Sequence, residues 1–162
     1  MKDPNHMMKN YLIYFLIFFG ASLILWGDTE LLGDITREDI LQSCPDWEEV
    51  IHSYTPDEEA IESLQTLSYQ VEIEVVLGTW CPDSKRHVSE YFKVLDRLDN
   101  SNFLSTYIGI PRNKEARESY IKGKNIQKVP TFIVRVEGRE IGRIIEIPTK
   151  SIEHDLLGIL KQ

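Results

Sequence analysis

The chain has 162 residues, of which 42% are hydrophobic and 27% are charged. This length and composition fit one globular domain with its own core and exclude a disordered chain. The net charge of −8, from 18 basic and 26 acidic residues, excludes binding driven by nucleic-acid phosphates. Two cysteines, Cys44 and Cys81, are too few for a disulfide-dense scaffold or a cysteine-only zinc site.

Residues 1–27 differ from the rest of the chain. Lys2 and Lys9 precede an uninterrupted apolar run that begins at Tyr11 and ends at Trp26. A basic start followed by such a run is typical of a signal peptide or a membrane anchor, and both interpretations stay open. The positive charges place the N-terminus in the cytoplasm. We therefore expect an exported or membrane-anchored protein with its globular part outside the cytoplasm.

The region that follows is predicted to be helical. We expect residues 28–68 to form a helical N-terminal extension of the main domain. Pro45 suits a first helical position. Thr55 is expected to cap the next helix, with Pro56 in its first turn and Glu58 completing a capping box.

The hydrophobic period changes at residue 71. The sequence VEIEVVL at 71–77 predicts a strand that enters the middle of a sheet. Residues 78–84 form a turn into an amphipathic helix, and residues 103–110 predict a second strand. The apolar stripe of that helix consists of Val88, Tyr91, Phe92, Leu95 and Leu98. A β-α-β unit of this kind requires a parallel pair of strands.

The remaining elements add antiparallel strands. Residues 114–121 predict a short helix, and 131–136 and 140–147 predict two strands around a glycine-containing hairpin turn. Residues 151–160 predict a closing helix. The element order predicts an α/β fold with a mixed central sheet flanked by helices.

The turn before the long helix carries the chemically informative residues. Cys81 lies where unpaired backbone N–H groups and the positive end of the helix dipole favour thiolate over thiol. Pro82 fits the first turn, because its missing N–H would have no helical partner. We expect Cys81 to be partly exposed. On position alone, an inert buried cysteine is an equal alternative.

Two segments resemble a known family. The sequence VVLGTWCPDS at 75–84 resembles the active-site strand and turn of the thioredoxin superfamily. The sequence VPTF at 129–132, followed by a strand, a glycine turn and a strand, resembles its cis-proline loop and terminal hairpin. The resemblance covers residues 71–160. It implies a thioredoxin-like three-layer domain at residues 69–162.

The resemblance also implies roles for individual residues. Cys81 becomes the nucleophilic cysteine, and Trp80 becomes the aromatic residue that shields it. Pro130 becomes a cis-proline packed against the Cys81 turn, with a trans proline opening an edge strand as the alternative. Val129 would offer its backbone N–H and C=O to an extended substrate. The substrate-binding residues implied in this way are Trp80, Pro82, Val129, Pro130 and Thr131.

The chain departs from the family at Ser84, where the usual site has a second cysteine. Serine cannot resolve a mixed disulfide, so dithiol cycling through these two positions is excluded. Cys81 then acts alone with an external resolving thiol, pairs with Cys44, or belongs to a non-catalytic binding module. We expect Ser84 to face the sulfur and to donate a hydrogen bond to the thiolate.

The function expected from these observations is thiol–disulfide exchange outside the cytoplasm through Cys81 and Ser84, a monothiol-type site. Its partners would be protein or small-molecule thiols and disulfides, with no cofactor, metal or nucleic acid. A thioredoxin-fold binding module is the alternative. Cys44 is expected to be a half-buried thiol outside a disulfide. His87 lies off the apolar stripe of its helix and is expected to be solvated.

Overall fold

The computed structural model describes residues 30–161, so the apolar run at 11–26 lies outside the described residues. Within residues 30–161 we find no helix that combines the length and the apolar character needed to cross a membrane.

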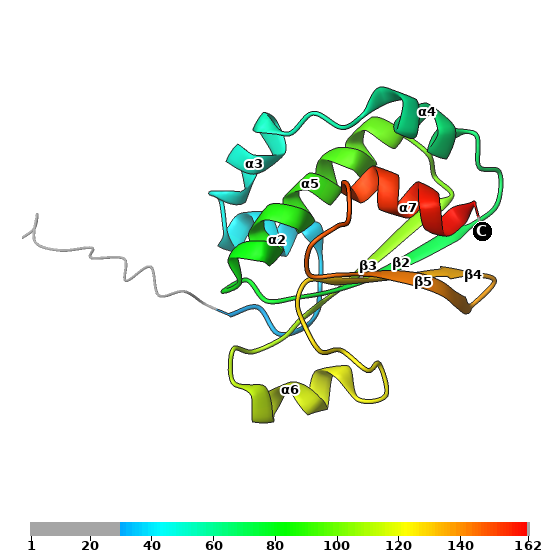
Figure 1. Ribbon diagram of the computed structural model, residues 1–162. Helices are drawn as coiled ribbons and strands as arrows, with labels where there is room; N and C mark the ends of the chain where they lie inside the picture. Colours follow the sequence, from blue (N-terminus) through cyan, green and yellow to red (C-terminus); the bar gives the residue numbers. More distant parts are fainter. Residues whose placement is uncertain (1–29, 162) are drawn as a thin grey trace, which may run out of the picture.

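A five-stranded sheet with the order β1-β3-β2-β4-β5 runs through the molecule (Figure 1). The strands are β1 (Gly33–Ile35), β2 (Val71–Leu77), β3 (Phe103–Gly109), β4 (Thr131–Val136) and β5 (Arg139–Ile145). Strands β2 and β3 are parallel, and the other neighbouring pairs are antiparallel.

Helices cover the two faces of this sheet unequally. In Figure 1, α6 lies alone below the sheet, and the other helices lie above it. The helices are α2 (Arg37–Ser43), α3 (Trp47–Ser53), α4 (Glu58–Gln65), α5 (Pro82–Leu98), α6 (Lys114–Ile121) and α7 (Ile152–Leu160). The predicted α/β architecture, a mixed sheet flanked by helices, is confirmed.

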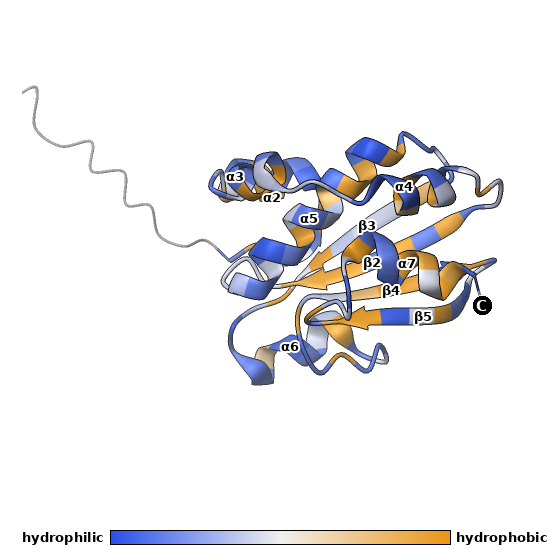
Figure 2. Cartoon of the chain, turned by 45° about the horizontal axis from the view of Figure 1, so that its top comes forward, coloured by the Kyte–Doolittle hydropathy of each residue, from blue (hydrophilic) through white to orange (hydrophobic). Residues whose placement is uncertain are grey.

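The core lies between the sheet and α5. Figure 2 shows the strands largely in the hydrophobic colour, with the mixed colouring of amphipathic helices beside them. The apolar stripe predicted for α5 packs onto the sheet through two edge-to-face ring contacts. The Tyr91 and Phe132 rings lie 5.4 Å apart, and the Phe92 and Tyr107 rings lie 5.5 Å apart. Such aromatic pairs stabilise by about 0.5–1.5 kcal/mol beyond the area they bury.

Strand β1 was not predicted from the sequence. Three residues are too few to show a strand period, and they lie in a region expected to be helical. Gly33 pairs with Gly109 at the end of β3. A Cβ on Gly109 would lie 2.1 Å from the backbone oxygen of Leu31. The missing side chain therefore allows the chain before β1 to approach β3 closely.

The helix starts in the N-terminal region differ from those expected. Helix α3 begins after Asp46, so Pro45 precedes the helix. Helix α4 is capped by Asp57 in place of Thr55, and its carboxylate accepts a hydrogen bond from the Ala60 N–H at 2.9 Å. An aspartate directly before the first helical residue satisfies one of the unpaired N–H groups there, which accounts for the shifted start.

Strand β5 ends two residues earlier than predicted. Glu137 and Gly138 both have positive φ, 53° and 73°, as a two-residue hairpin turn with the twist of the flanking strands requires. The strand begins directly after this turn. Glu146 then has a φ of 62°, which turns the chain out of the extended conformation. The predicted hairpin is confirmed, and its second strand is shorter.

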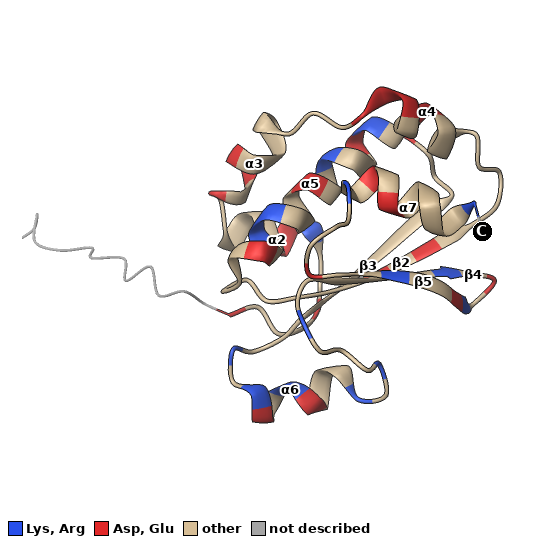
Figure 3. Ribbon diagram, in the orientation of Figure 1, with Lys and Arg blue, Asp and Glu red and all other residues tan. Residues whose placement is uncertain are grey.

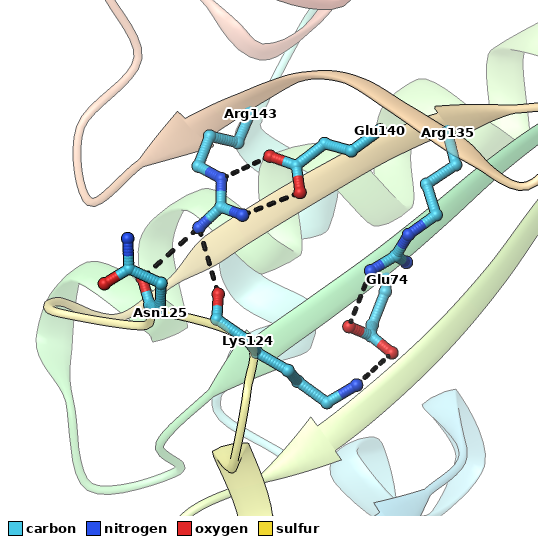
Figure 4. A network of polar contacts seen from close by, with 6 residues as sticks. All are labelled: Glu74, Lys124, Asn125, Arg135, Glu140 and Arg143. Carbon is cyan, nitrogen blue, oxygen red and sulfur yellow. Dashed lines mark hydrogen bonds and ion pairs between the residues drawn. The ribbon is translucent and has the colours of Figure 1, made fainter.

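Part of the second face of the sheet is polar and holds the segment that links α6 to β4. Figure 3 shows basic residues of β4 and β5 beside an acidic residue of β2. Glu74 on β2 accepts from Lys124 Nζ at 2.8 Å, and Arg143 on β5 donates to the backbone oxygens of Lys124 and Asn125 at 3.3 Å (Figure 4). These contacts fix the start of the segment that ends in Val129–Pro130.

A buried carboxylate joins the α3–α4 connection to α7. Glu153 is 2% exposed and accepts from the Tyr54 hydroxyl at 2.8 Å and from the Asp57 N–H at 3.1 Å. Burial, together with the Glu153 carboxylate, raises the pKa of the Tyr54 hydroxyl, so it remains a donor. Side chains of α2, α3 and α4 share one hydrophobic core with the sheet.

Replacing this carboxylate tests its contribution to stability. We expect Glu153→Ala to lower the free energy of unfolding by about 1–3 kcal/mol, because two partly buried hydrogen bonds lose their acceptor. Glu62→Ala, at an exposed carboxylate on α4, is the control and should change it by less than about 0.5 kcal/mol. Denaturant unfolding measures both. Equal stabilities of the two variants would contradict this account.

Candidate functional site

Cys81 is the N-cap residue of α5 and follows the turn that leaves β2. Its N–H donates to the Gly78 oxygen at 2.9 Å, and its own oxygen accepts the Lys85 N–H at 3.0 Å. Pro82 is the first helical residue and is exposed. The predicted strand–turn–helix arrangement is confirmed. It places Cys81 at the N-terminus of α5, directly after the turn that ends β2.

The sulfur of Cys81 is more buried than predicted. Cys81 is a free thiol and is 8% exposed, since it packs in a small apolar cluster with Val76, Ile110 and Val129. Its Sγ lies 3.5 Å from the Val129 oxygen, to which the thiol donates. The Val129–Pro130 bond is cis, as the resemblance implied. The end of β2 and the loop before β4 therefore meet at the sulfur.

Trp80 forms a fixed wall beside the cysteine. Its indole Nε1 donates to the Ile110 oxygen at 2.9 Å. The guanidinium groups of Arg112 and Arg117 lie over the ring, 5.5 and 4.9 Å from its centroid. The ring also covers Gly78, where a Cβ would lie 2.5 Å from it. A side chain at residue 78 would therefore displace the indole.

Ser84 lies one helical turn beyond Cys81, as expected, and is fully buried. Its hydroxyl oxygen accepts the Gly78 N–H at 3.2 Å. No hydrogen bond joins Ser84 to the Cys81 sulfur among those of residues 30–161, so the expected bond to the sulfur is not formed. The physical reason is that the buried N–H at the end of β2 needs an acceptor.

The cysteine lies on the wall of a groove of about 450 Å³. The groove is lined by Thr79, Trp80, Cys81, Pro82, Lys85 and Arg112, together with Ser43, Cys44, Pro45, Asp46 and Trp47 at the α2–α3 connection. Two of the five expected substrate-binding residues, Trp80 and Pro82, therefore share the groove with Cys81. Val129, Pro130 and Thr131 are buried and do not line it. The Thr131 hydroxyl donates to the Lys128 oxygen at 2.7 Å.

Sequence reasoning did not assign Arg112 or the α2–α3 connection to the lining of this groove. Arg112 had a usable signal, because it follows β3, and the carboxyl ends of parallel strands β2 and β3 meet at one edge of the sheet. Asp46 forms an ion pair with Lys85 across the groove. The position of the α2–α3 connection depends on tertiary packing, and no local pattern indicates it.

His87 was predicted to be solvated, but it is buried, with only 5% of its surface exposed. Its helix α5 contacts α3, α4 and α7 as well as the core, so little of its surface remains for solvent. His87 Nδ1 lies 2.7 Å from the Glu90 carboxylate, which also accepts from Arg86 at 3.1 Å. Burial raises the Glu90 pKa, but these two partners outweigh it, and the net pKa lies below the ordinary value of 4.5.

Residues 30–161 contain no group of three or more His, Cys, Asp or Glu side chains placed to hold a metal ion.

The chain belongs to the thioredoxin family. A family model described as Thioredoxin matches residues 38–155, which include α3, α4 and all of α2 except its first residue. Two solved structures are similar, each at 16% identity over 87% of this chain and 98% of the other. One is a protein of unknown function from Pseudomonas aeruginosa, with a TM-score of 0.56, and the other is an HIV epitope scaffold, with a TM-score of 0.57. At this identity they show the fold alone. No match was found among curated proteins.

Two glycine substitutions, one beside Trp80 and one away from it, should change the free energy of unfolding in opposite directions. Gly78→Ala should lower the free energy of unfolding by about 1–3 kcal/mol, because the added methyl overlaps the held indole. Gly158→Ala, inside α7 with no heavy atom within 4 Å of the new Cβ, should raise it by roughly 0.5–1 kcal/mol. Denaturant unfolding of both variants measures the difference. A stabilised Gly78→Ala protein would show that the indole is not held there.

The Glu90 cluster predicts a pH dependence. Because the folded pKa of Glu90 lies below 4.5, its stabilising contribution is complete above pH 4.5 and is lost as the pH falls through the folded pKa. Between about pH 5 and pH 3, the Glu90→Gln protein should therefore lose less stability than the natural protein. Exposed Glu62→Gln is the control and should follow the natural curve. Parallel curves for all three proteins would contradict the assignment.

Proposed function

We propose that the protein catalyses thiol–disulfide exchange with Cys81 as its single nucleophile at residues 81–84. One observation supports this most strongly. The Cys81 sulfur lies at the N-terminus of α5, contacts the cis-proline loop, and lines an open groove. Helix N-terminal N–H groups favour the thiolate, which is the nucleophilic form. A solely structural cysteine would not need this position.

The exchange takes place in two balanced steps. The Cys81 thiolate attacks one sulfur of a disulfide R–S–S–R′, forming Cys81–S–S–R and releasing R′S⁻, which takes a proton from water. A thiol supplied from solution then attacks the R sulfur as its thiolate. The new disulfide leaves, and Cys81 is restored as thiolate. Protein or small-molecule thiols and disulfides therefore suffice as partners, and no cofactor takes part in either step.

The groove residues position the incoming disulfide. Trp80 and Pro82 form the wall beside Cys81. In the thiol form, Cys81 donates to the Val129 oxygen. The thiolate has no proton to donate, so ionisation frees this oxygen to accept a backbone N–H from an extended substrate. Within the loop of Val129, Pro130 and Thr131, it is thus the Val129 oxygen that lies next to the reacting sulfur.

We also propose that exchange takes place outside the cytoplasm. This rests on the sequence, since the apolar run from Tyr11 to Trp26 follows Lys2 and Lys9. Export would place the domain where disulfides form and persist.

A binding module without catalysis is the second candidate. Two observations favour it, the 8% exposure of Cys81 and the use of the Ser84 hydroxyl as a structural acceptor. In that function the groove beside Trp80 would hold a partner segment, and the sulfur would pack without reacting.

Trapping the mixed disulfide distinguishes these two functions. In a Cys44→Ser background, the protein should gain the mass of one glutathione on Cys81 when incubated with glutathione disulfide, because no second thiol can release it. The same background with Cys81→Ser is the control and should gain nothing. Mass spectrometry of the intact protein and its peptides measures both. A Cys81 that stays unmodified would favour the binding module.

Restoring the second cysteine tests the geometry of the same site. Ser84→Cys in the Cys44→Ser background should close a disulfide with Cys81, because the pair then has the family spacing. It should gain insulin reductase activity that the Cys44→Ser protein lacks. We expect the free energy of unfolding of this variant to fall by about 1–3 kcal/mol, because the Gly78 N–H loses a good hydrogen-bond acceptor. A folded variant that neither closes the disulfide nor gains activity would show that the site has diverged beyond one substitution.

A further inference from the structure

We propose that Cys44 is the resolving cysteine for Cys81. This inference rests on the proposed function and adds a second, internal thiol to it. The two cysteines of the chain come from different elements, the C-cap of α2 and the N-cap of α5, and both line the same groove of about 450 Å³. A disulfide bound to Cys81 in this groove would therefore lie between the two.

The contacts around Cys44 hold it on this side of the molecule. Asp46, two residues further on, forms an ion pair with Lys85, which lies one helical turn beyond Cys81. The helices on either side of the connection are anchored in the core by Ile40 and Trp47, both buried. Cys44 thus lies half-buried in the same groove as the reacting sulfur.

Little electrostatic energy opposes a movement of the Cys44–Asp46 connection toward Cys81. A disulfide needs Cα atoms about 4.4–6.8 Å apart, so any wider separation must close by a shift of the Cys44–Asp46 connection. Both partners of the Asp46–Lys85 ion pair are partly exposed, and such pairs contribute about 0–1 kcal/mol. Breaking this ion pair is therefore a small obstacle to closure.

The charges lining the groove also suit a second thiolate. Lys85 and Arg112 both line the groove with Asp46, which is paired to Lys85, so the charged residues of the lining leave one positive charge in excess. Cations near a cysteine favour its thiolate form, which is the form that attacks a disulfide.

The resolving step balances in atoms and electrons. After Cys81 has attacked R–S–S–R′ and released R′S⁻, the Cys44 thiolate attacks the Cys81 sulfur of Cys81–S–S–R. A Cys44–Cys81 disulfide forms, and RS⁻ leaves and takes a proton from water. The substrate disulfide has gained two electrons, and the protein has lost them. A dithiol reductant then reduces the internal disulfide and restores both thiols.

The test follows the glutathione adduct with time. The full chain, with either the natural sequence or Cys44→Ser, is incubated with glutathione disulfide, quenched with acid and analysed by mass spectrometry. On the natural protein the glutathione adduct should disappear, leaving a mass two hydrogen atoms below that of the reduced protein. Digestion should then give a pair of peptides joined through Cys44 and Cys81. The adduct on Cys44→Ser should last at least about tenfold longer, since an internal thiol acts at millimolar or higher effective concentration.

A relocated thiol is the matched control. Cys44→Ser combined with Ser53→Cys places the second thiol on α3, where residue 53 lines a neighbouring groove that does not include Cys81. This variant should retain the adduct as long as Cys44→Ser does. If it releases the adduct as fast as the natural protein, position 44 is not special, and the inference is overturned.

The remaining outcomes separate the two claims. An adduct that lasts as long on the natural protein as on Cys44→Ser would overturn the resolving role, while exchange at Cys81 stands. A disulfide between two chains in place of the internal one would also overturn it. No adduct on Cys81 in the Cys44→Ser protein would overturn the proposed function itself.

Discussion

The contact between the Cys81 sulfur and the Val129 oxygen, at 3.5 Å, depends on the strand order of the sheet. Strand β4 runs antiparallel to β2, so the chain that enters β4 lies beside the point where the chain leaves β2. The same edge receives the end of β3, which is parallel to β2 and leads to Arg112. One topological constraint thus gathers the cysteine, the cis-proline loop and the cation that lies over Trp80.

The remaining contacts hold this junction in place from both faces of the sheet. On one face, Arg143 and Glu74 fix the segment that leads to Val129 (Figure 4). On the other, Ser84 accepts the buried Gly78 N–H at the end of β2, so the position that carries a thiol in the usual family site here stabilises the strand end. The α2–α3 connection then closes the groove across from Cys81.

The sequence predicted those features that local pattern or resemblance determines. Residues 71–77 and α5 are long and periodic, and the cis bond at Val129–Pro130 followed from the family resemblance. Features that depend on tertiary packing were missed. Strand β1 is too short to show a period, His87 is buried because helices cover the outer side of α5, and the position of Cys44 depends on how α2 and α3 dock. The positions of Cys81 and of the cis-proline loop were therefore predictable, but the contribution of the α2–α3 connection to the groove was not.

The central claim is that folding makes a nearly buried Cys81 sulfur more reactive. The most direct measurement is the rate at which Cys81 reacts with a small aromatic disulfide in the Cys44→Ser protein, folded and unfolded in urea, at the same pH. The account predicts a faster reaction in the folded protein, although Cys81 is only 8% exposed there. A slower reaction in the folded protein would contradict it, because burial would then protect an inert thiol.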